Sequence, residues 1–194
     1  MTDKSVKIAI TNAMGTKHLL DCVNHVRPIE PSGLGVVDAV CSVVIGQMLS
    51  RTAANSIKQR VFARAAELGK QYSAELDAES LRECGLSRRK IKTIHLFYDN
   101  YLKDQARYDN WKHLSPEHLF LSVEKEWGMS HWTASMLAIF HFGMEDVYPL
   151  GDGTIIKVER RLKEQGIIIS PDRAQPYRSY FALFLWSLVD EGYI

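Results

Sequence analysis

The stretch from Trp127 to Arg161 constrains the fold of this chain more than any other. A turn at 127–131 contains a glycine and precedes an apolar run of helix length, Trp132 to Phe142. A tight Gly-Asp-Gly turn centred on Asp152 then precedes a second helical run, Thr154 to Leu162. A turn that leads directly into a helix offers an anion unpaired backbone N–H groups and the positive end of the helix dipole. The stretch therefore predicts an anion-binding turn and an isolated carboxylate, each next to a helix.

Helix-period patterns dominate the rest of the chain as well, and the only candidate strand, 167–169, is too short to count. We therefore predict an all-α fold. Ser50, Ser87 and Ser115 are good N-caps at the starts of three helices. The predicted helices, in chain order, cover residues 8–26, 37–47, 51–68, 74–84, 88–101, 116–127, 132–142, 155–165 and 177–189.

The composition limits the classes of function. Of 194 residues 46% are hydrophobic, which is enough for one sizeable core or two small lobes. The 24 Lys and Arg residues nearly cancel the 23 acids, for a net charge of +1. A nucleic-acid-binding protein of this composition would need a local basic face.

Several cofactors and locations are disfavoured by the sequence. Cys22, Cys41 and Cys84 are far apart and too few for a four-thiolate iron–sulfur cluster, and no His or Cys residues have zinc-ligand spacing. We expect buried reduced thiols and no metal site. The sequence has neither a signal peptide nor an apolar run of transmembrane length. We expect a cytoplasmic protein with no membrane partner, associated with the nucleoid if its source is bacterial.

Each candidate site residue also has a purely structural interpretation. Asp152 could simply cap the helix that follows it. Met48 lies at the corner between two helices, where it is either a core residue or an exposed wedge. The cations at 88–92 could be an ordinary solvated face or a set of phosphate contacts. Trp132 and Trp186 could both be core aromatics, and the sequence alone leaves these alternatives open.

Four separated blocks, taken together, resemble the helix-hairpin-helix (HhH-GPD) DNA glycosylase superfamily, and within it the 3-methyladenine DNA glycosylase II family. One such block would be weak evidence, but four in the family's order are specific. They are Ile45-Gly46-Gln47-Met48-Leu49-Ser50, Gly85-Leu86-Ser87-Arg88-Arg89-Lys90, Trp132-Thr133-Ala134 with Tyr148-Pro149-Leu150-Gly151-Asp152, and Tyr177-Arg178-Ser179-Tyr180 with Trp186.

The resemblance implies a role for each candidate residue. Asp152 matches the essential carboxylate, and Trp132 and Trp186 match aromatic residues of the base pocket. Met48 matches the residue that enters the duplex where the flipped nucleotide leaves, and we assign its neighbour Gln47 to the same intercalating wedge. The expected phosphate contacts are Gly128, Met129, Ser130 and His131 of the hairpin, together with Arg88, Arg89 and Lys90.

These roles agree with the chemistry of base removal. A base must leave the stack before its glycosidic bond can be cut, and an apolar wedge fills the gap. Purines methylated at N3 or N7 are cationic, so indole faces attract them. A carboxylate stabilises the oxocarbenium character of the sugar and can orient or deprotonate the attacking water.

Three positions depart from the family's pattern. Ser130 stands where the hairpin usually has a second glycine, and Met136 stands where the best-known member has a pocket tyrosine. Trp132 occupies the position of the lysine that forms a Schiff base in glycosylases that also nick DNA. Without that amine, we expect no lyase activity.

We therefore predict one two-lobed HhH-GPD domain over residues 1–194, with lobes of about 36–125 and 1–35 plus 126–194. The helix-hairpin-helix would cover about 115–142, and the active-site cleft would lie between the lobes. The resemblance implies a monomeric, monofunctional enzyme that excises alkylated purines from damaged double-stranded DNA without a cofactor, apart from a monovalent cation at the hairpin. The alternatives are a glycosylase for a deaminated or oxidised base, and a non-catalytic helix-hairpin-helix DNA-binding protein.

Overall fold

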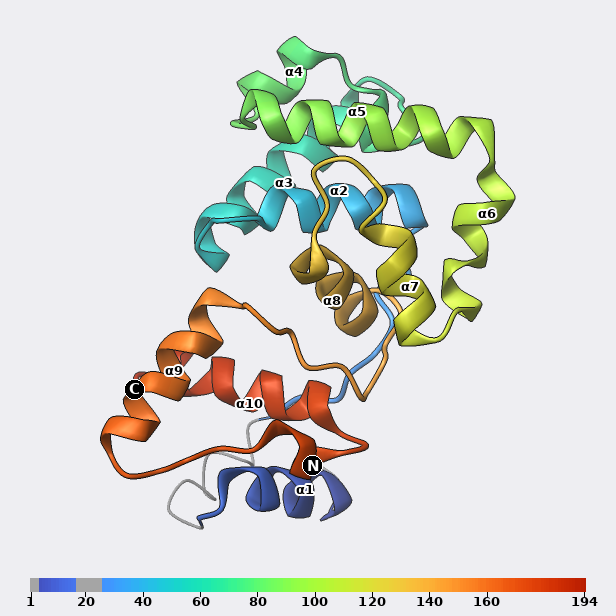
Figure 1. Ribbon diagram of the computed structural model, residues 1–194. Helices are drawn as coiled ribbons and strands as arrows, with labels where there is room; N and C mark the ends of the chain where they lie inside the picture. Colours follow the sequence, from blue (N-terminus) through green and yellow to red (C-terminus); the bar gives the residue numbers. More distant parts are fainter. Residues whose placement is uncertain (1–3, 17–25) are drawn as a thin grey trace. The chain divides into compact units, whose positions relative to one another are not determined.

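The computed structural model describes residues 4–16 and 26–194, and this part of the chain is all-α, without a β-strand (Figure 1). The predicted fold class is therefore confirmed. The chain groups into two compact units, one of residues 1–31 with 138–194 and one of residues 32–137. No helix among the described residues has the length and apolar character needed to cross a membrane.

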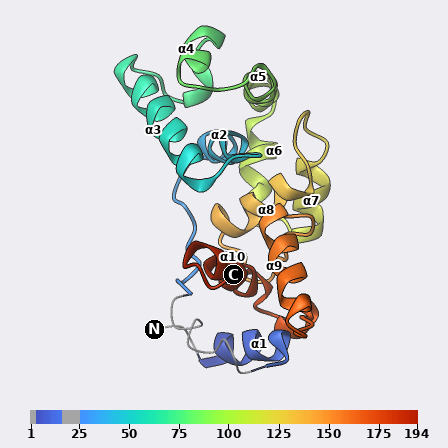
Figure 2. The ribbon, with the colours of Figure 1, turned by 90° about the vertical axis from the view of Figure 1, so that its left-hand side faces the viewer.

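The 32–137 unit is built around α2, whose sequence is almost wholly apolar. Val37, Val40 and Val44 of α2 are completely buried, and α2 packs against both α3 and α5. The views of Figures 1 and 2 agree that α2 and α5 run side by side. The helices of this unit are α2 (Val36–Gly46), α3 (Arg51–Glu67), α4 (Ala78–Glu83), α5 (Arg88–Lys103), α6 (Gln105–Asp109), α7 (Pro116–Val123) and the larger part of α8 (His131–Phe140).

The three predicted serine caps are confirmed. The hydroxyls of Ser50, Ser87 and Ser115 each accept the backbone N–H three residues further on, at the first turns of α3, α5 and α7. These caps satisfy N–H groups that would otherwise lack a partner inside the helix. The sequence therefore predicts these helix starts within one residue.

A buried carboxylate fastens the segment after α7 to α5 and α6. Glu126 is 5% exposed. Its oxygens accept hydrogen bonds from Asn100 Nδ2 at 3.0 Å, Tyr108 Oη at 2.8 Å and Arg107 Nη2 at 3.3 Å. A buried charge is tolerated when it is paired and hydrogen-bonded, as it is here. Glu126 therefore holds in place the segment that leads into the hairpin.

The other unit is centred on α10 (Arg178–Asp190), which packs against α1 (Lys4–Met14) and α9 (Gly153–Glu164) (Figure 1). A short 3₁₀ helix, η4 (Pro171–Ala174), also packs against α1 and α10. The completely buried side chains of this core are Ile10, Val158, Leu162, Ala174, Phe181, Ala182, Phe184, Leu185 and Leu188.

Several predicted helix bounds are wrong. α1 ends at Met14, before Gly15 with φ +63°, and residues 17–25 of the predicted 8–26 helix lie outside the described residues. The predicted 74–84 helix is broken, because Asp77 caps a separate α4 by accepting the Ser80 N–H at 2.7 Å. α7 ends at Val123 rather than at residue 127, and the sequence analysis missed α6.

The structural units differ from the predicted lobes at residues 32–35 and, more widely, at residues 126–137. Residues 126–137 group with the 32–137 unit and not with the C-terminal helices. The physical reason is a set of contacts to that unit, including those of Glu126 and a hydrogen bond from Gln47 Nε2 to Gly128 O at 3.2 Å. The interpretation of the whole chain as one domain stays a prediction.

The two cysteines within the described residues, Cys41 and Cys84, are buried free thiols, as predicted. Burial raises the pKa of the Cys41 thiol to about 12 and also raises that of Cys84. Cys41 is therefore a protonated core side chain and not a nucleophile. Cys22 lies outside the described residues.

The Glu126 network generates a prediction about stability. Glu126→Ala should lower the free energy of unfolding by about 2–4 kcal/mol, because it leaves buried donors without their acceptor. Glu124→Ala is the matched control, because Glu124 is exposed and pairs only with the exposed His131; it should cost less than about 1 kcal/mol. Urea unfolding measures both, and equal losses would contradict the role given to Glu126.

Candidate functional site

Asp152 lies in the tight turn between the extended segment 147–150 and α9. Its side chain caps α9, because Oδ1 accepts the backbone N–H of Thr154 at 3.0 Å and of Ile155 at 2.9 Å. Gly151 has φ +80°, a conformation that a side chain would disfavour. The structural interpretation of Asp152 as an N-cap is therefore correct.

Capping does not account for the whole environment of Asp152. The same Oδ1 accepts a third hydrogen bond, from Trp186 Nε1 of α10 at 3.0 Å, and Asp152 is only 7% exposed. A helix cap needs no partner on another helix. Two candidate residues that are 34 positions apart are thus brought into direct contact, with the carboxylate held by three N–H donors.

Trp186 has an aromatic neighbour as well as the carboxylate. Its ring stacks on Phe140 with the centroids 5.7 Å apart and the planes inclined by 29°. One face of the indole is therefore covered by Phe140 and its N–H edge is directed at Asp152. A planar base that stacked on Trp186 would have to use the opposite face.

Tyr148 fastens the segment that leads to Asp152. Its hydroxyl donates to Glu159 Oε1 of α9 at 2.7 Å, and its ring stacks on Phe181 of α10 at a centroid distance of 6.1 Å. Burial, followed by the bond to Glu159, raises the pKa of Tyr148 far above its ordinary value. Tyr148 is therefore a neutral phenol that positions the segment and does not act as a base.

The hairpin between α7 and α8 packs directly on α5. Gly128 has φ +76°, and a Cβ there would collide with the side chain of Thr93. The ammonium of Lys92 lies 4.5 Å from the ring centroid of Trp127. Gly128 is thus required both for its backbone conformation and for this close approach.

Two of the predicted phosphate donors already have partners within the protein. Met129 N–H donates to Glu126 O at 3.2 Å, and Ser130 N–H donates to Thr133 Oγ1 at 3.3 Å. Met129 is also buried, with 8% of its surface exposed. The backbone N–H groups of Met129 and Ser130 are thus already used within the protein, and the phosphate contact of the hairpin stays a prediction.

Met48 is the most exposed large apolar side chain described, with 100% of its surface accessible, so its interpretation as a core residue is wrong. Among the described residues it is also the one non-glycine residue with a positive φ, +56°. Such a backbone persists only where its surroundings hold it. Gln47 differs from Met48, because its amide Nε2 donates to Gly128 O at 3.2 Å and to Thr133 Oγ1 at 3.1 Å.

The basic cluster divides into two kinds of residue. Arg88 and Arg89 are exposed in the first turn of α5. Lys90 is half-buried, and its Nζ donates to Ile45 O at the end of α2, at 2.8 Å. Burial lowers the pKa of Lys90. Its ammonium therefore supports the turn before Met48, while Arg88 and Arg89 keep the predicted role of phosphate contacts.

Trp132 and Met136 are one turn apart on α8 and so lie on the same face of that helix. Trp132 is half-buried and Met136 is 7% exposed. Both belong to the 32–137 unit, whereas Asp152 and Trp186 belong to the other. Their place in a shared base pocket stays a prediction.

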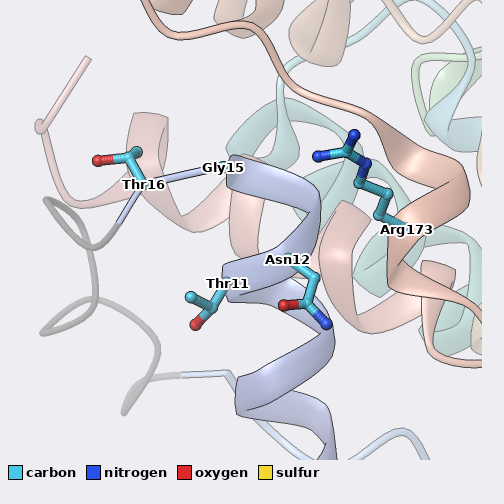
Figure 3. A pocket seen from close by; sticks show the side chains of 5 residues that line it. All are labelled: Thr11, Asn12, Gly15, Thr16 and Arg173. Carbon is cyan, nitrogen blue, oxygen red and sulfur yellow. The ribbon is translucent and has the colours of Figure 1, made fainter.

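A cavity of about 590 Å³ lies at the end of α1 and contains none of the predicted site residues. Its lining residues are Thr11, Asn12, Gly15, Thr16 and Arg173. In Figure 3 the Thr11 and Asn12 side chains point away from the Arg173 guanidinium, so these polar groups do not converge. The described residues also contain no group of three or more His, Cys, Asp or Glu side chains that could hold a metal ion.

Comparison with known proteins finds relatives of this chain. No protein-family model matches it. Two proteins of Schizosaccharomyces pombe are each 28% identical: alkylbase DNA glycosidase-like protein mag2, over 79% of this chain and 76% of its own, and DNA-3-methyladenine glycosylase 1, over 88% and 80%.

Solved structures agree with these relatives. The S. pombe 3-methyladenine DNA glycosylase in complex with abasic DNA matches with a TM-score of 0.79 and 25% identity, over 96% of this chain and 97% of that one. The chain is thus similar in both sequence and fold to 3-methyladenine DNA glycosylases. A 3-methyladenine DNA glycosylase from Archaeoglobus fulgidus shares the fold, with a TM-score of 0.73 and 19% identity, over 100% of this chain and 71% of that one.

Sequence reasoning missed several residues that position the candidate site residues within each unit. They are Thr93, Glu126, Thr133, Tyr148 and Glu159. Glu126 follows α7, and Thr133 and Tyr148 lie inside the blocks that carry the resemblance. The contacts that give them this role join residues 11 to 86 positions apart, so no spacing pattern reveals them. A polar residue at an otherwise apolar position, such as Thr133 in α8, is the one available signal.

The left-handed backbone of Met48 generates a second prediction. Met48→Gly should raise the free energy of unfolding by about 0.5–1 kcal/mol, because glycine adopts this conformation without the penalty of a Cβ. Met48→Ala keeps the penalty and should be nearly neutral. Chemical denaturation measures the free energy of unfolding of both variants. A clear loss of stability in either variant would show that Met48 packs in the core.

Proposed function

We propose that this chain is a monofunctional DNA glycosylase that hydrolyses the N-glycosidic bond of alkylated purines in double-stranded DNA, in base excision repair. The observation that carries the proposal is the Asp152 carboxylate, held by two N–H groups of α9 and by the indole of Trp186. The names of the S. pombe relatives support the alkylated-base substrate. A protein that only binds DNA would not require this carboxylate.

Asp152 acts on the sugar from which the base departs. As the glycosidic bond breaks, its electron pair leaves with the base, and positive charge develops on the sugar ring. A fixed carboxylate stabilises that charge without having to reorganise. Water then adds its oxygen to the anomeric carbon and gives up one proton to the carboxylate. The products are the free base and an intact strand with an abasic site.

Alkylation makes the base both a better leaving group and a better ligand. Purines methylated at N3 or N7 are cationic, and the face of Trp186 opposite Phe140 is suited to attract them. We place Trp132 and Met136 in the same base pocket. Trp132 has no amine that could form a Schiff base, so the strand is not nicked.

In this proposal, residues of the 32–137 unit bind the DNA. Gly128 and the first turn of α8 hold a phosphate, and Arg88 and Arg89 contact the backbone. Met48 enters the duplex where the flipped nucleotide leaves. These roles need no cofactor, because side chains, backbone groups and water perform them. We also propose that a monovalent cation binds at the hairpin. The protein acts as a monomer in the cytoplasm.

Asp152→Asn tests the carboxylate. Asparagine is as good an N-cap as aspartate, so the protein should fold normally. The single-turnover rate on a duplex with one 7-methylguanine should fall by about a hundredfold or more, because the charge is lost. Asp77→Asn is the matched control, because it alters the N-cap of α4 in the same way. A near-normal excision rate for Asp152→Asn would show that Asp152 acts only as the N-cap of α9.

Arg88→Gln with Arg89→Gln tests the backbone contacts. Binding should weaken equally on damaged and undamaged duplexes, and the slope of log K against log salt should become less steep by about two. The matched control changes Arg160 and Arg161 to Gln, because these two cations are also adjacent and exposed on a helix. An unchanged slope, measured by fluorescence anisotropy over a salt series, would make Arg88 and Arg89 an ordinary solvated face.

A further inference from the structure

A network of hydrogen bonds joins the turn that carries Met48 to the hairpin. Gln47 Nε2 donates to Gly128 O at 3.2 Å and to Thr133 Oγ1 at 3.1 Å. The same hydroxyl oxygen accepts the Ser130 N–H at 3.3 Å. Thr133 has no exposed surface. The side chain of Gln47, which directly precedes Met48, is thus bonded both to the Gly128 carbonyl of the hairpin and to Thr133 in the first turn of α8.

The turn is also held from α5. Lys90 Nζ donates to Ile45 O at 2.8 Å, two residues before Gln47. Within the turn, Gln47 N–H donates to Val44 O at 3.3 Å, and Leu49 N–H donates to Gly46 O at 3.3 Å. The backbone of Ile45, Gly46 and Gln47 before Met48, and the peptide unit that follows Met48, are therefore held by these hydrogen bonds.

These contacts explain how Met48 can be both fully exposed and confined to φ +56°. A long apolar side chain in a left-handed conformation is unfavourable, so it persists only where neighbouring contacts determine the backbone. Gln47 is the neighbour best placed to fix the backbone of Met48, because its side-chain amide is bonded to the hairpin and its backbone begins the turn.

We propose that Gln47 is a positioning residue, not an intercalating one, and that it couples entry of Met48 into the duplex to the phosphate grip of the hairpin. The inference rests on the proposed function for the roles of Met48 and the hairpin. With the link intact, a phosphate held at the hairpin sets where Met48 meets the base stack. Without it, the hairpin can hold DNA while Met48 is out of place.

The test uses duplexes that contain a tetrahydrofuran abasic analogue next to 2-aminopurine, whose fluorescence reports unstacking by the wedge. Gln47→Leu removes both hydrogen bonds of the amide, and Thr133→Val removes one of its two acceptors without changing the size of the side chain. Each should weaken binding to this duplex by about tenfold and reduce the fluorescence change. Binding to undamaged duplex should change by less than about twofold, since the phosphate contacts remain.

Three further variants complete the comparison. Thr133→Ser keeps the hydroxyl and should restore wild-type behaviour. Gln59→Leu is the matched control, because Gln59 is exposed on α3, and it should bind normally. The double variant of Gln47→Leu with Thr133→Val should lose about tenfold, like either single variant, because both remove the hydrogen bond between Gln47 and Thr133. Gln47→Glu, which keeps the length and loses both donors, should match Gln47→Leu if the valine variant does not fold.

Two results would overturn the proposal. Thr133 is buried and cannot touch DNA, so normal behaviour of a folded Thr133→Val beside an impaired Gln47→Leu would make Gln47 a DNA contact. Additive losses in the double variant, about a hundredfold, would mean the same. The fluorescence measurement needs no base excision. Failure of the wild-type protein to release an alkylated base would therefore contradict the proposed function and leave this test intact.

Discussion

The three hydrogen bonds on Asp152 Oδ1 are the interaction on which the account of this protein depends. Two of them begin α9, and the third ties α9 to α10 through Trp186. The same oxygen therefore serves the fold and orients the carboxylate. Preorganisation of this kind is what electrostatic catalysis needs, because a group that is already fixed does not have to reorient as charge develops.

Side-chain contacts also hold in place the hairpin and the Met48 turn, which contact DNA in the proposed function. The hairpin is fastened by the buried carboxylate of Glu126, by the close contact of Gly128 with Thr93, and by the amide of Gln47. All three anchors belong to the 32–137 unit. Met48, by contrast, is a large apolar side chain that lies fully in solvent, and its backbone is held in an unfavourable conformation. A rigid frame with one exposed apolar side chain is well suited to enter a base stack.

Local sequence signals predicted the fold class and several helix starts, because caps and periodicity depend on residues within one or two turns. Ser50, Ser87 and Ser115 are examples. Asp77 was missed because its cap interrupts a run that is helical in composition. The site was predicted only in part. The resemblance selected Asp152 and Trp186, but no pattern shows that they bond to each other, and Gln47 and Lys90 were assigned to DNA although their polar groups bond to the protein.

The central claim is that the chain releases an alkylated base and leaves the strand intact. The direct measurement is chromatography of the bases set free from duplex DNA treated with dimethyl sulfate, together with a gel of the strands before and after hot alkali. The account predicts 3-methyladenine and 7-methylguanine in solution, breaks only after alkali, and no adduct trapped by borohydride. Absence of free base, or a break without alkali, would contradict it.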